Sequence, residues 1–221
     1  VGRKFERNLM IIAVDGPAAA GKGTLSKNLA KHLGLAHLDT GKIYRAVGFS
    51  VLSSGGDPSD PVAAVAAART LTPGALGNPT LTDDSIAYAA SKVAAIDTVR
   101  ALLLAFQRDF AENPPEDAPG AVLDGRDIGT VVCPDADVKM FVDAKIEVRA
   151  ERRYKELLDR GEETIYARVL RDLKDRDDRD RNRSVAPLKP AADAFVLDTS
   201  TLDAGDAFRA ALAFIESEKT G

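Results

Sequence analysis

The chain has 221 residues, of which 45% are hydrophobic and 29% are charged, and its formal net charge is −4. These values predict one globular domain over residues 1–221, and the small negative charge argues against nucleic acid as the main partner. The only cysteine, Cys133, excludes an intrachain disulfide and suits a reducing cytoplasm, where we expect the protein to act. With His32 and His37 as the only histidines, the chain has too few ligands for a Cys/His zinc site.

The first element is an apolar run from Leu9 to Val14, which indicates a buried strand that ends at Asp15. The run is too short for the core of a signal peptide or for a membrane span, so we expect no membrane partner. Met10 is a candidate start residue, which makes Val1 to Leu9 an upstream extension. We therefore leave Val1 to Asn8 out of the fold prediction.

A glycine-rich turn follows this strand, and a helical pattern of Leu25, Leu29 and Leu33 follows the turn. The turn is Gly16-Pro17-Ala18-Ala19-Ala20-Gly21-Lys22-Gly23-Thr24. A plain glycine turn is the simpler interpretation, but a strand-turn-helix setting is what a phosphate-binding P-loop requires. Its backbone N–H groups and the helix N-terminus can bind polyphosphate oxygens, Lys22 adds a full charge, and the Thr24 hydroxyl can bind magnesium. The motif therefore predicts an ATP site with Mg²⁺.

The middle of the chain predicts helices, with one stretch of different composition between them. A short apolar piece spans 35–38, a helix opens at 39–41 and runs to about Leu52, and a loop covers 53–58. Residues of about 58–84 are rich in Ala and then in Pro and Gly, and we expect an insert there rather than core. A long helix is predicted from Ser85 to Phe110, and Asn113-Pro114-Pro115 ends it.

The second half predicts three further strands, at 121–123, 137–142 and 194–197. Helices are expected at about 147–160, from near Thr164 after the break at Gly161, and at the C-terminal end, where Phe208, Leu212 and Ile215 share one face. Strands and helices thus alternate along the chain. That order predicts an α/β fold, with a parallel sheet of about five strands flanked by helices.

The most charged segment, residues 174–183, is predicted to be helical. The simple interpretation is a solvent-exposed face with opposite-charge pairs, and it accounts for Asp177, Asp178 and Arg181. The inward face of this helix at helical spacing is Ile165, Val169 and Leu173, and then Arg176, Asp180 and Arg183. Charges on an inward face are costly unless they are compensated, and arginine forks suit phosphate oxygens. The pattern therefore predicts an anionic ligand beside this helix.

Five segments stand in one order and together resemble bacterial cytidylate kinases, which are P-loop nucleoside monophosphate kinases. They are Gly16–Thr24, Asp39–Arg45, Ser91–Ala95, Asp124–Thr130, and Arg176–Arg183 followed by Ser184–Leu188. The P-loop alone fits many ATPases, although its Gly-Lys-Gly-Thr ending is similar to the monophosphate kinases. The Asp-Gly-Arg-Asp-x-Gly-Thr and Arg-Asp-Asp-Arg-Asp-x-Asn-Arg runs are much more specific. The resemblance covers nearly the whole chain after about Met10, and it implies a P-loop kinase fold with a monophosphate-side insert and a helical lid over about 151–188.

The resemblance implies phosphorylation of CMP, with dCMP as a second acceptor, by ATP and Mg²⁺; we expect a monomer. The implied ligands of the monophosphate are Thr40, Tyr44, Arg45, Arg126 and Arg183, with Arg45 on the α-phosphate. The implied readers of cytosine are Ser91, Arg100 and Asp127, and the implied ribose contact is Asp180, helped by Arg176. Lys22, Arg126, Arg176 and Arg183 are the implied catalytic residues, and Asp124 is the implied water-mediated partner of magnesium beside Thr24.

The chain departs from the family pattern between about Pro58 and Ser85, where members usually carry a longer insert with a β-meander. Asp97 also stands where a proline is usual. Two alternatives stay open: another small-acceptor P-loop kinase, such as a uridylate or shikimate kinase, and a P-loop switch or regulatory binding module. The chain has no Asn/Thr-Lys-x-Asp run to read guanine, which counts against a GTPase switch.

Overall fold

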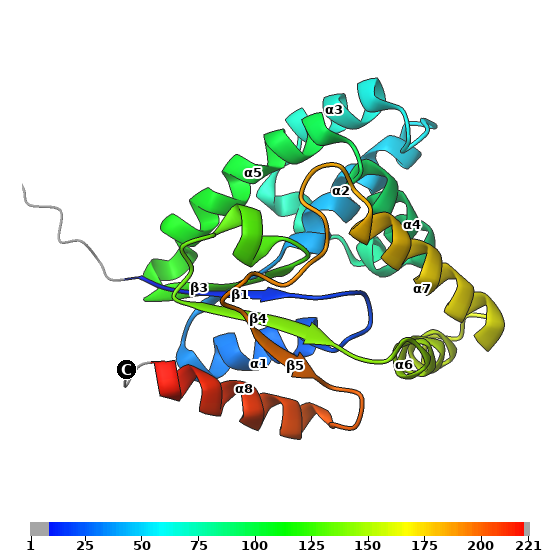
Figure 1. The fold of residues 1–221 in the computed structure, drawn as a ribbon. Coiled ribbons are helices and arrows are strands. Elements are labelled where there is room, and N and C mark those ends of the chain that lie inside the picture. Colours follow the sequence, from blue (N-terminus) through cyan, green and yellow to red (C-terminus); the bar gives the residue numbers. More distant parts are fainter. Residues whose placement is uncertain (1–8, 219–221) are drawn as a thin grey trace, which may run out of the picture.

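A computed structural model describes residues 9–218 of the chain, so Val1 to Asn8 lie outside the described residues. The molecule is built around a parallel five-stranded sheet with the strand order β2-β3-β1-β4-β5 (Figure 1). The strands are β1 (Met10–Asp15), β2 (Ala36–Asp39), β3 (Gly120–Gly125), β4 (Val138–Asp143) and β5 (Phe195–Asp198). The predicted α/β fold with a five-stranded parallel sheet is confirmed.

Helices cover both faces of the sheet. Because side chains alternate along a strand, Ile12 and Val14 of β1 face one layer and Ala13 faces the other. The first layer contains α1 (Lys22–Leu33) and α8 (Ala204–Glu218), and the second contains α2 (Thr40–Ser53) and α5 (Asp97–Glu112). Both cores consist mainly of aliphatic side chains, and every strand contributes buried positions.

The predicted long helix from Ser85 to Phe110 is wrong in one respect, because it is two helices. These are α4 (Asp84–Val93) and α5, and they are separated at Ala94–Ile96, where Ile96 adopts an extended backbone. Asp97 begins α5, a position at which a proline is also well tolerated. The break turns the chain so that Arg100, in the first turns of α5, is buried.

The segment of about 58–84 also differs from the prediction, because it contributes to the core. It holds α3 (Pro61–Arg69) and two short 3₁₀ turns, η1 (Pro73–Gly77) and η2 (Pro79–Thr82). Ala64 and Ala68 are buried in the layer formed with α2 and α5, and Leu81 is buried in a smaller cluster with Ala46. Small alanines let α3 approach its neighbours closely, so composition alone did not reveal this packing.

Two helices, α6 (Ile146–Asp159) and α7 (Tyr166–Arg181), lie beyond the carboxyl end of β4 (Figure 1). They pack on each other through Ala150, Leu157, Val169 and Leu173. Val169 and Leu173 therefore face inward as predicted, but Ile165 precedes the helix and is 65% exposed. Short turns complete the chain, at η3 (Pro115–Asp117) and at the π-helical turn η4 (Ile128–Val132). Among residues 9–218 no helix is both long and apolar enough to cross a membrane.

Candidate active site

The glycine-rich turn connects β1 to α1, as the motif predicts. Gly16 has a φ of 151°, and a Cβ there would lie 2.0 Å from the carbonyl oxygen of Val142 on β4. Gly21, the N-cap of α1, has a φ of 91°. Only glycine tolerates such a close backbone approach, so the turn passes tightly over the carboxyl ends of the strands. Parallel sheets bind ligands at this edge.

Lys22 begins α1, and its Nζ lies 3.5 Å from the carbonyl oxygen of Pro17 within the turn. Burial lowers the pKa of Lys22 to about 7, and the positive charge of Arg126 acts in the same direction. Asp124 and Asp39 oppose that shift. The lysine is therefore held beside charges from β2 and β3, where a phosphate chain would complete its environment.

Four arginines of the predicted site come from separate parts of the chain: Arg45 on α2, Arg126 after β3, Arg176 on α7, and Arg183 two residues after the end of α7. Burial lowers the pKa of Arg176 to about 10, and Arg126 and Arg45 lower it further. Burial likewise lowers the pKa of Arg45, and Arg126 contributes. The positive charge of Arg126 acts on Arg45, Arg176 and Arg183 alike, so the structure brings these arginines into one cluster.

Several nitrogens of this cluster are buried without a protein acceptor. Among residues 9–218 they include Nε of Arg45, Nε of Arg176 and Nη2 of Arg183. An unpaired buried donor costs free energy unless something accepts from it. The cluster therefore has the donors that a phosphate group needs.

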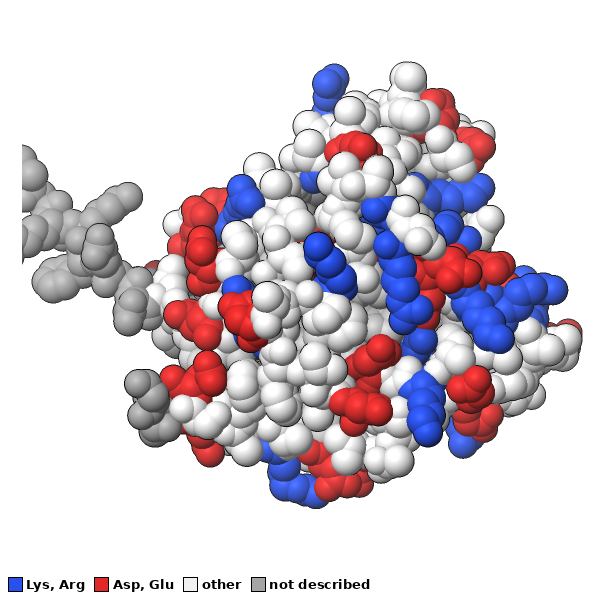
Figure 2. Space-filling view, in the orientation of Figure 1, with Lys and Arg blue, Asp and Glu red and all other residues white. Residues whose placement is uncertain are grey.

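Asp180 holds the cluster together. Nε of Arg126 donates to its Oδ2 at 2.8 Å, and Nη2 of Arg183 lies 3.8 Å from its Oδ1. Burial acts to raise the pKa of Asp180, but Arg126, Arg176 and Arg183 outweigh it and hold that pKa below its usual value. Figure 2 shows Lys and Arg side chains gathered on the side of the molecule where α6 and α7 lie, with acidic side chains among them.

A second group contains the residues implied to read a base. Arg100 and Asp127 form an ion pair in which both side chains are only 7% exposed. The Arg100 guanidinium also lies 5.6 Å from the ring centre of Tyr44. Ser91 on α4 is buried, and its Oγ accepts a hydrogen bond from Nε of Arg179 at 3.1 Å. All three implied cytosine readers are therefore buried polar groups, and each has a hydrogen-bond or ion-pair partner within the protein.

Thr40 and Tyr44 make supporting contacts. The Thr40 hydroxyl donates to the backbone oxygen of Asp124 at 2.8 Å, so its proton is used within the protein. Tyr44 is buried in the core layer of α2 and α5, and its ring lies beside Arg100. These contacts fix the start of α2, which carries Arg45.

The carboxylate of Asp124 lies at the end of β3 and is almost fully buried. Its Oδ2 is 2.8 Å from Nε2 of His37 on β2, the strand next to it. This leaves the other carboxylate oxygen for a ligand. Thr24 lies on the first turn of α1 and is exposed.

Arg149 is a site residue that sequence reasoning missed. Its contact with Asp177 shows that the predicted solvent-exposed position of Asp177 is wrong. Asp177 is 3% exposed rather than solvent-facing, and it accepts two hydrogen bonds from Arg149, at 2.6 and 3.2 Å. Arg149 also donates to the backbone oxygen of Ala18 in the P-loop, at 3.3 Å. This ion pair thus joins α6 and α7 to the P-loop. No local sequence signal separates Arg149 from the many surface arginines around it.

Asp15 is the second residue that sequence reasoning missed. Its carboxylate oxygens accept from the backbone N–H groups of Ile128 and Gly129, at 2.7 and 2.8 Å. Burial raises the pKa of Asp15 to about 7, although these two backbone donors lower it. The contact joins the end of β1 to the turn that carries Arg126 and Asp127. A charged residue directly after a buried strand was the available signal.

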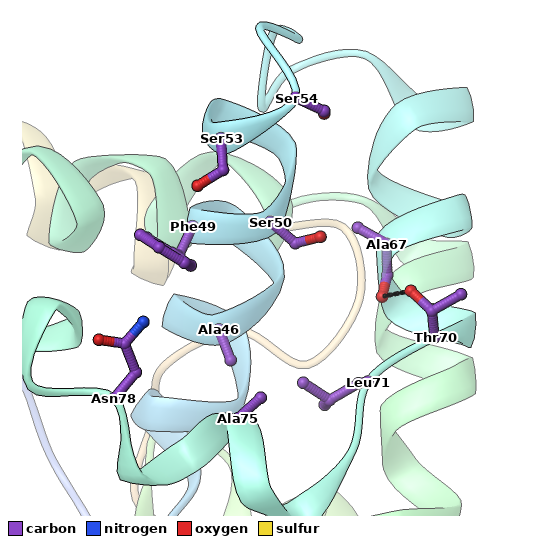
Figure 3. A pocket seen from close by; sticks show the side chains of 10 residues that line it. All are labelled: Ala46, Phe49, Ser50, Ser53, Ser54, Ala67, Thr70, Leu71, Ala75 and Asn78. Carbon is purple, nitrogen blue, oxygen red and sulfur yellow. Dashed lines mark hydrogen bonds between the residues drawn. The ribbon is translucent and has the colours of Figure 1, made fainter.

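A hollow with a volume of about 450 Å³ lies elsewhere, between α2, the end of α3 and η1 (Figure 3). Its lining includes Phe49, Ser50, Leu71 and Asn78, and it has no charged side chain. None of the predicted site residues lines it. It is therefore separate from the phosphate cluster.

Comparison with known proteins gives a consistent result. The cytidylate kinase family model matches residues 12–217. The cytidylate kinase of Rhodospirillum rubrum is 58% identical over 213 residues, which cover 96% of this chain and all of the relative. That of Paramagnetospirillum magneticum is 60% identical over 209 residues, which cover 95% of this chain and 99% of the relative. An uncharacterised protein from Eubacterium ventriosum shares the fold, with a TM-score of 0.55 at 14% identity over 95% of this chain and 99% of its own. The chain therefore belongs to the cytidylate kinase family.

Proposed function

We propose that the protein transfers the γ-phosphoryl group of ATP to the α-phosphate of CMP, giving CDP and ADP, and that dCMP is a second acceptor. The observation that carries the proposal is the arginine cluster around Asp180, with its unpaired buried nitrogens, at the carboxyl edge of the sheet beside Lys22. Family membership supports the choice of nucleotide.

The reaction needs little acid-base chemistry, because the attacking oxygen belongs to a phosphate that is already ionised. Catalysis then consists of positioning and charge neutralisation. In this proposal the P-loop from Gly16 to Thr24 binds the phosphates of ATP, and Arg45 binds the phosphate of CMP. Lys22, Arg126, Arg176 and Arg183 stabilise the charge that develops on the transferred group.

The residues near Lys22 also fit a magnesium ion. Mg²⁺ prefers oxygen ligands and is usually held by one or two protein groups together with phosphates. The Thr24 hydroxyl and, through water, the remaining oxygen of Asp124 would hold it. The ion would neutralise phosphate charge and help to orient the phosphate chain.

Base selection in this proposal uses the buried polar groups beside Tyr44. Asp127 accepts from the amino group of cytosine, and Arg100 and Ser91 donate to its ring nitrogen and carbonyl. Uracil would place a carbonyl against Asp127 and a ring N–H against a donor. Such mismatches typically cost about 1–3 kcal/mol each.

We further propose that α6, α7 and the following loop, over about 151–188, act as a lid that closes on the nucleotides and keeps water out. The segment of about 58–84 forms the wall on the monophosphate side within one kinase domain, 1–221. We propose that this enzyme is a cytoplasmic monomer.

The decisive experiment measures ADP release, coupled to NADH oxidation, with CMP, dCMP, UMP, AMP, GMP, TMP and shikimate as acceptors. We expect CMP to exceed UMP by more than about tenfold in kcat/KM. Preference for UMP or shikimate would replace the proposal by another small-acceptor kinase. Nucleotide binding without turnover of any acceptor would indicate a regulatory binding module.

A further inference from the structure

Arg179 on α7 has no role in the reaction described above, yet it touches a group implied to read the base. Its Nε donates to Oγ of Ser91 on α4 at 3.1 Å, across 88 residues of sequence. Its guanidinium also lies 5.5 Å from the ring centre of Tyr88, which precedes Ser91 by one helical turn. The guanidinium thus makes a cation–π contact with the Tyr88 ring while its Nε donates to the serine oxygen.

This contact determines which way the Ser91 hydroxyl can act. A guanidinium only donates, whereas a hydroxyl has one proton and two lone pairs. Ser91 must therefore accept from Arg179, and its own proton points elsewhere. Within residues 9–218, no group accepts a hydrogen bond from that proton. Ser91 is only 5% exposed, so its hydroxyl is largely shielded from bulk water.

A charged donor on the serine oxygen also changes how strongly the Ser91 hydroxyl donates and accepts hydrogen bonds. Hydrogen bonds in a chain polarise one another, so a hydroxyl that accepts from a cation becomes a better donor and a poorer acceptor. Arg179 thus biases Ser91 toward donating. Cytosine presents acceptors at its ring nitrogen and carbonyl, whereas uracil presents an N–H at that ring position.

We propose that Arg179 is a specificity-positioning residue, which fixes Ser91 as a hydrogen-bond donor to the base and so favours cytosine over uracil. The inference rests on the proposed function, because it concerns base choice at the same site. It also links base recognition to α7, the helix that carries Arg176 and Asp180 and that directly precedes Arg183. The sequence held a signal for Arg179, since it lies three residues after Arg176 on the same side of the helix.

The test compares Arg179→Met with Arg181→Met. Methionine has a similar length but cannot donate, and Arg181 is an exposed residue of the same helix. We expect the ratio of kcat/KM for CMP to that for UMP to fall about tenfold or more in Arg179→Met, mainly through KM for CMP. Arg181→Met should keep the wild-type ratio. If Arg179 only joined α7 to α4, kcat/KM would fall equally for CMP and UMP. The ratio would then stay the same, which would overturn the inference.

A double-variant cycle then tests the route through Ser91. In a Ser91→Ala background, Arg179→Met should change the CMP:UMP ratio less than about twofold, because the hydroxyl it orients is gone. A fall as large as in the wild-type background would mean that Arg179 acts through another group, and the inference would be wrong. Should Arg179→Met fail to fold, Arg179→Leu replaces it, because leucine also cannot donate, and an unchanged ratio there has the same meaning.

The acceptor panel and the Arg179 variants separate the proposed function from the role of Arg179. A wild-type protein that phosphorylates no cytidine nucleotide contradicts the proposed function. A wild-type protein that prefers CMP, with a ratio that Arg179→Met leaves intact, contradicts only the role of Arg179.

Discussion

Lys22 is a partly buried lysine that must be charged to neutralise a transferred phosphate. Burial lowers its pKa to about 7, and Arg126 adds to this effect, so in the free protein at pH 8 the amine is mostly neutral. A bound triphosphate raises that pKa again, because negative charge favours the ammonium. We therefore predict that ATP binding at pH 8 takes up close to one proton, and that at pH 6 it takes up little.

Titration calorimetry in two buffers of different ionisation enthalpy measures this uptake. Lys22→Met supplies the control, because it removes the titrating group while keeping a similar length. Proton uptake at pH 8 that persists in Lys22→Met would assign the linkage to another group.

The same residue should be decisive for turnover. We predict that Lys22→Ala lowers kcat on the order of 10³-fold or more, as for other charge stabilisers of phosphoryl transfer. Circular dichroism and thermal melting should show a folded protein. Turnover near that of the wild type in a folded variant would remove Lys22 from the catalytic set.

At the scale of one element, α7 and the two residues after it contain both clustered and solvent-facing arginines. Arg176 and Arg183 belong to the cluster around Asp180, whereas Arg181 is exposed. We predict that Arg176→Ala and Arg183→Ala lower kcat/KM for CMP far more than Arg181→Ala does. Steady-state kinetics of the three variants are the measurement, and equal losses would favour a uniformly charged surface helix.

The buried ion pair between α6 and α7 should dominate the stability of this helix pair. Asp177→Ala leaves the Arg149 guanidinium, whose side chain is 3% exposed, without its carboxylate. Removing one partner of a buried pair typically costs about 3–5 kcal/mol of unfolding free energy. Asp178→Ala, at an exposed position of the same helix, should stay within about 0.5 kcal/mol of the wild type.

Urea denaturation of the two variants measures the difference. An equal loss of unfolding free energy in both variants would mean that the Arg149–Asp177 ion pair contributes no more to stability than an exposed carboxylate. Replacing both Arg149 and Asp177 by leucine should recover much of the loss, because no charge then remains buried.

At the scale of the whole molecule, α6 and α7 are already connected to the segment of about 58–84 and to α4. Arg153 on α6 forms an ion pair with Asp84, and Arg160 donates to the carbonyl oxygen of Thr82 at 2.9 Å. Arg179 adds its contact with Ser91. Closure of α6 and α7 over the nucleotides should therefore also order the segment of about 58–84.

We predict that CMP slows hydrogen exchange in residues 58–84 and 151–188 together. Mass spectrometry of exchange with and without CMP measures this, and Asp84→Ala should weaken the protection at 58–84 without abolishing CMP phosphorylation. Protection by CMP at 151–188 alone would mean that the segment of about 58–84 takes no part in closure.

Features with local geometry were predictable from the amino-acid sequence alone. The P-loop follows from a strand, glycines at positive φ and a helix that are contiguous in the chain, so its place between β1 and α1 was predictable. The α/β fold followed from the alternation of strand and helix patterns. The inward phase of Asp180 on α7 followed from helical spacing, and its side chain is buried. The side chain of Arg183 is buried too, but α7 ends at Arg181, so helical spacing does not account for its position.

The pairing of charged side chains across distant parts of the chain became visible only in the tertiary structure. Arg126 and Asp180 are 54 residues apart, Arg149 and Asp177 are 28 apart, and Arg179 and Ser91 are 88 apart. The chain offers 30 basic and 34 acidic side chains, so charge alone permits many pairings. Packing selects among them, because an ion pair can be buried only where two elements bring both groups out of water together. The burial of Asp177, the break between α4 and α5, and the core role of Ala64 depend on the same long-range packing, which no local pattern specifies.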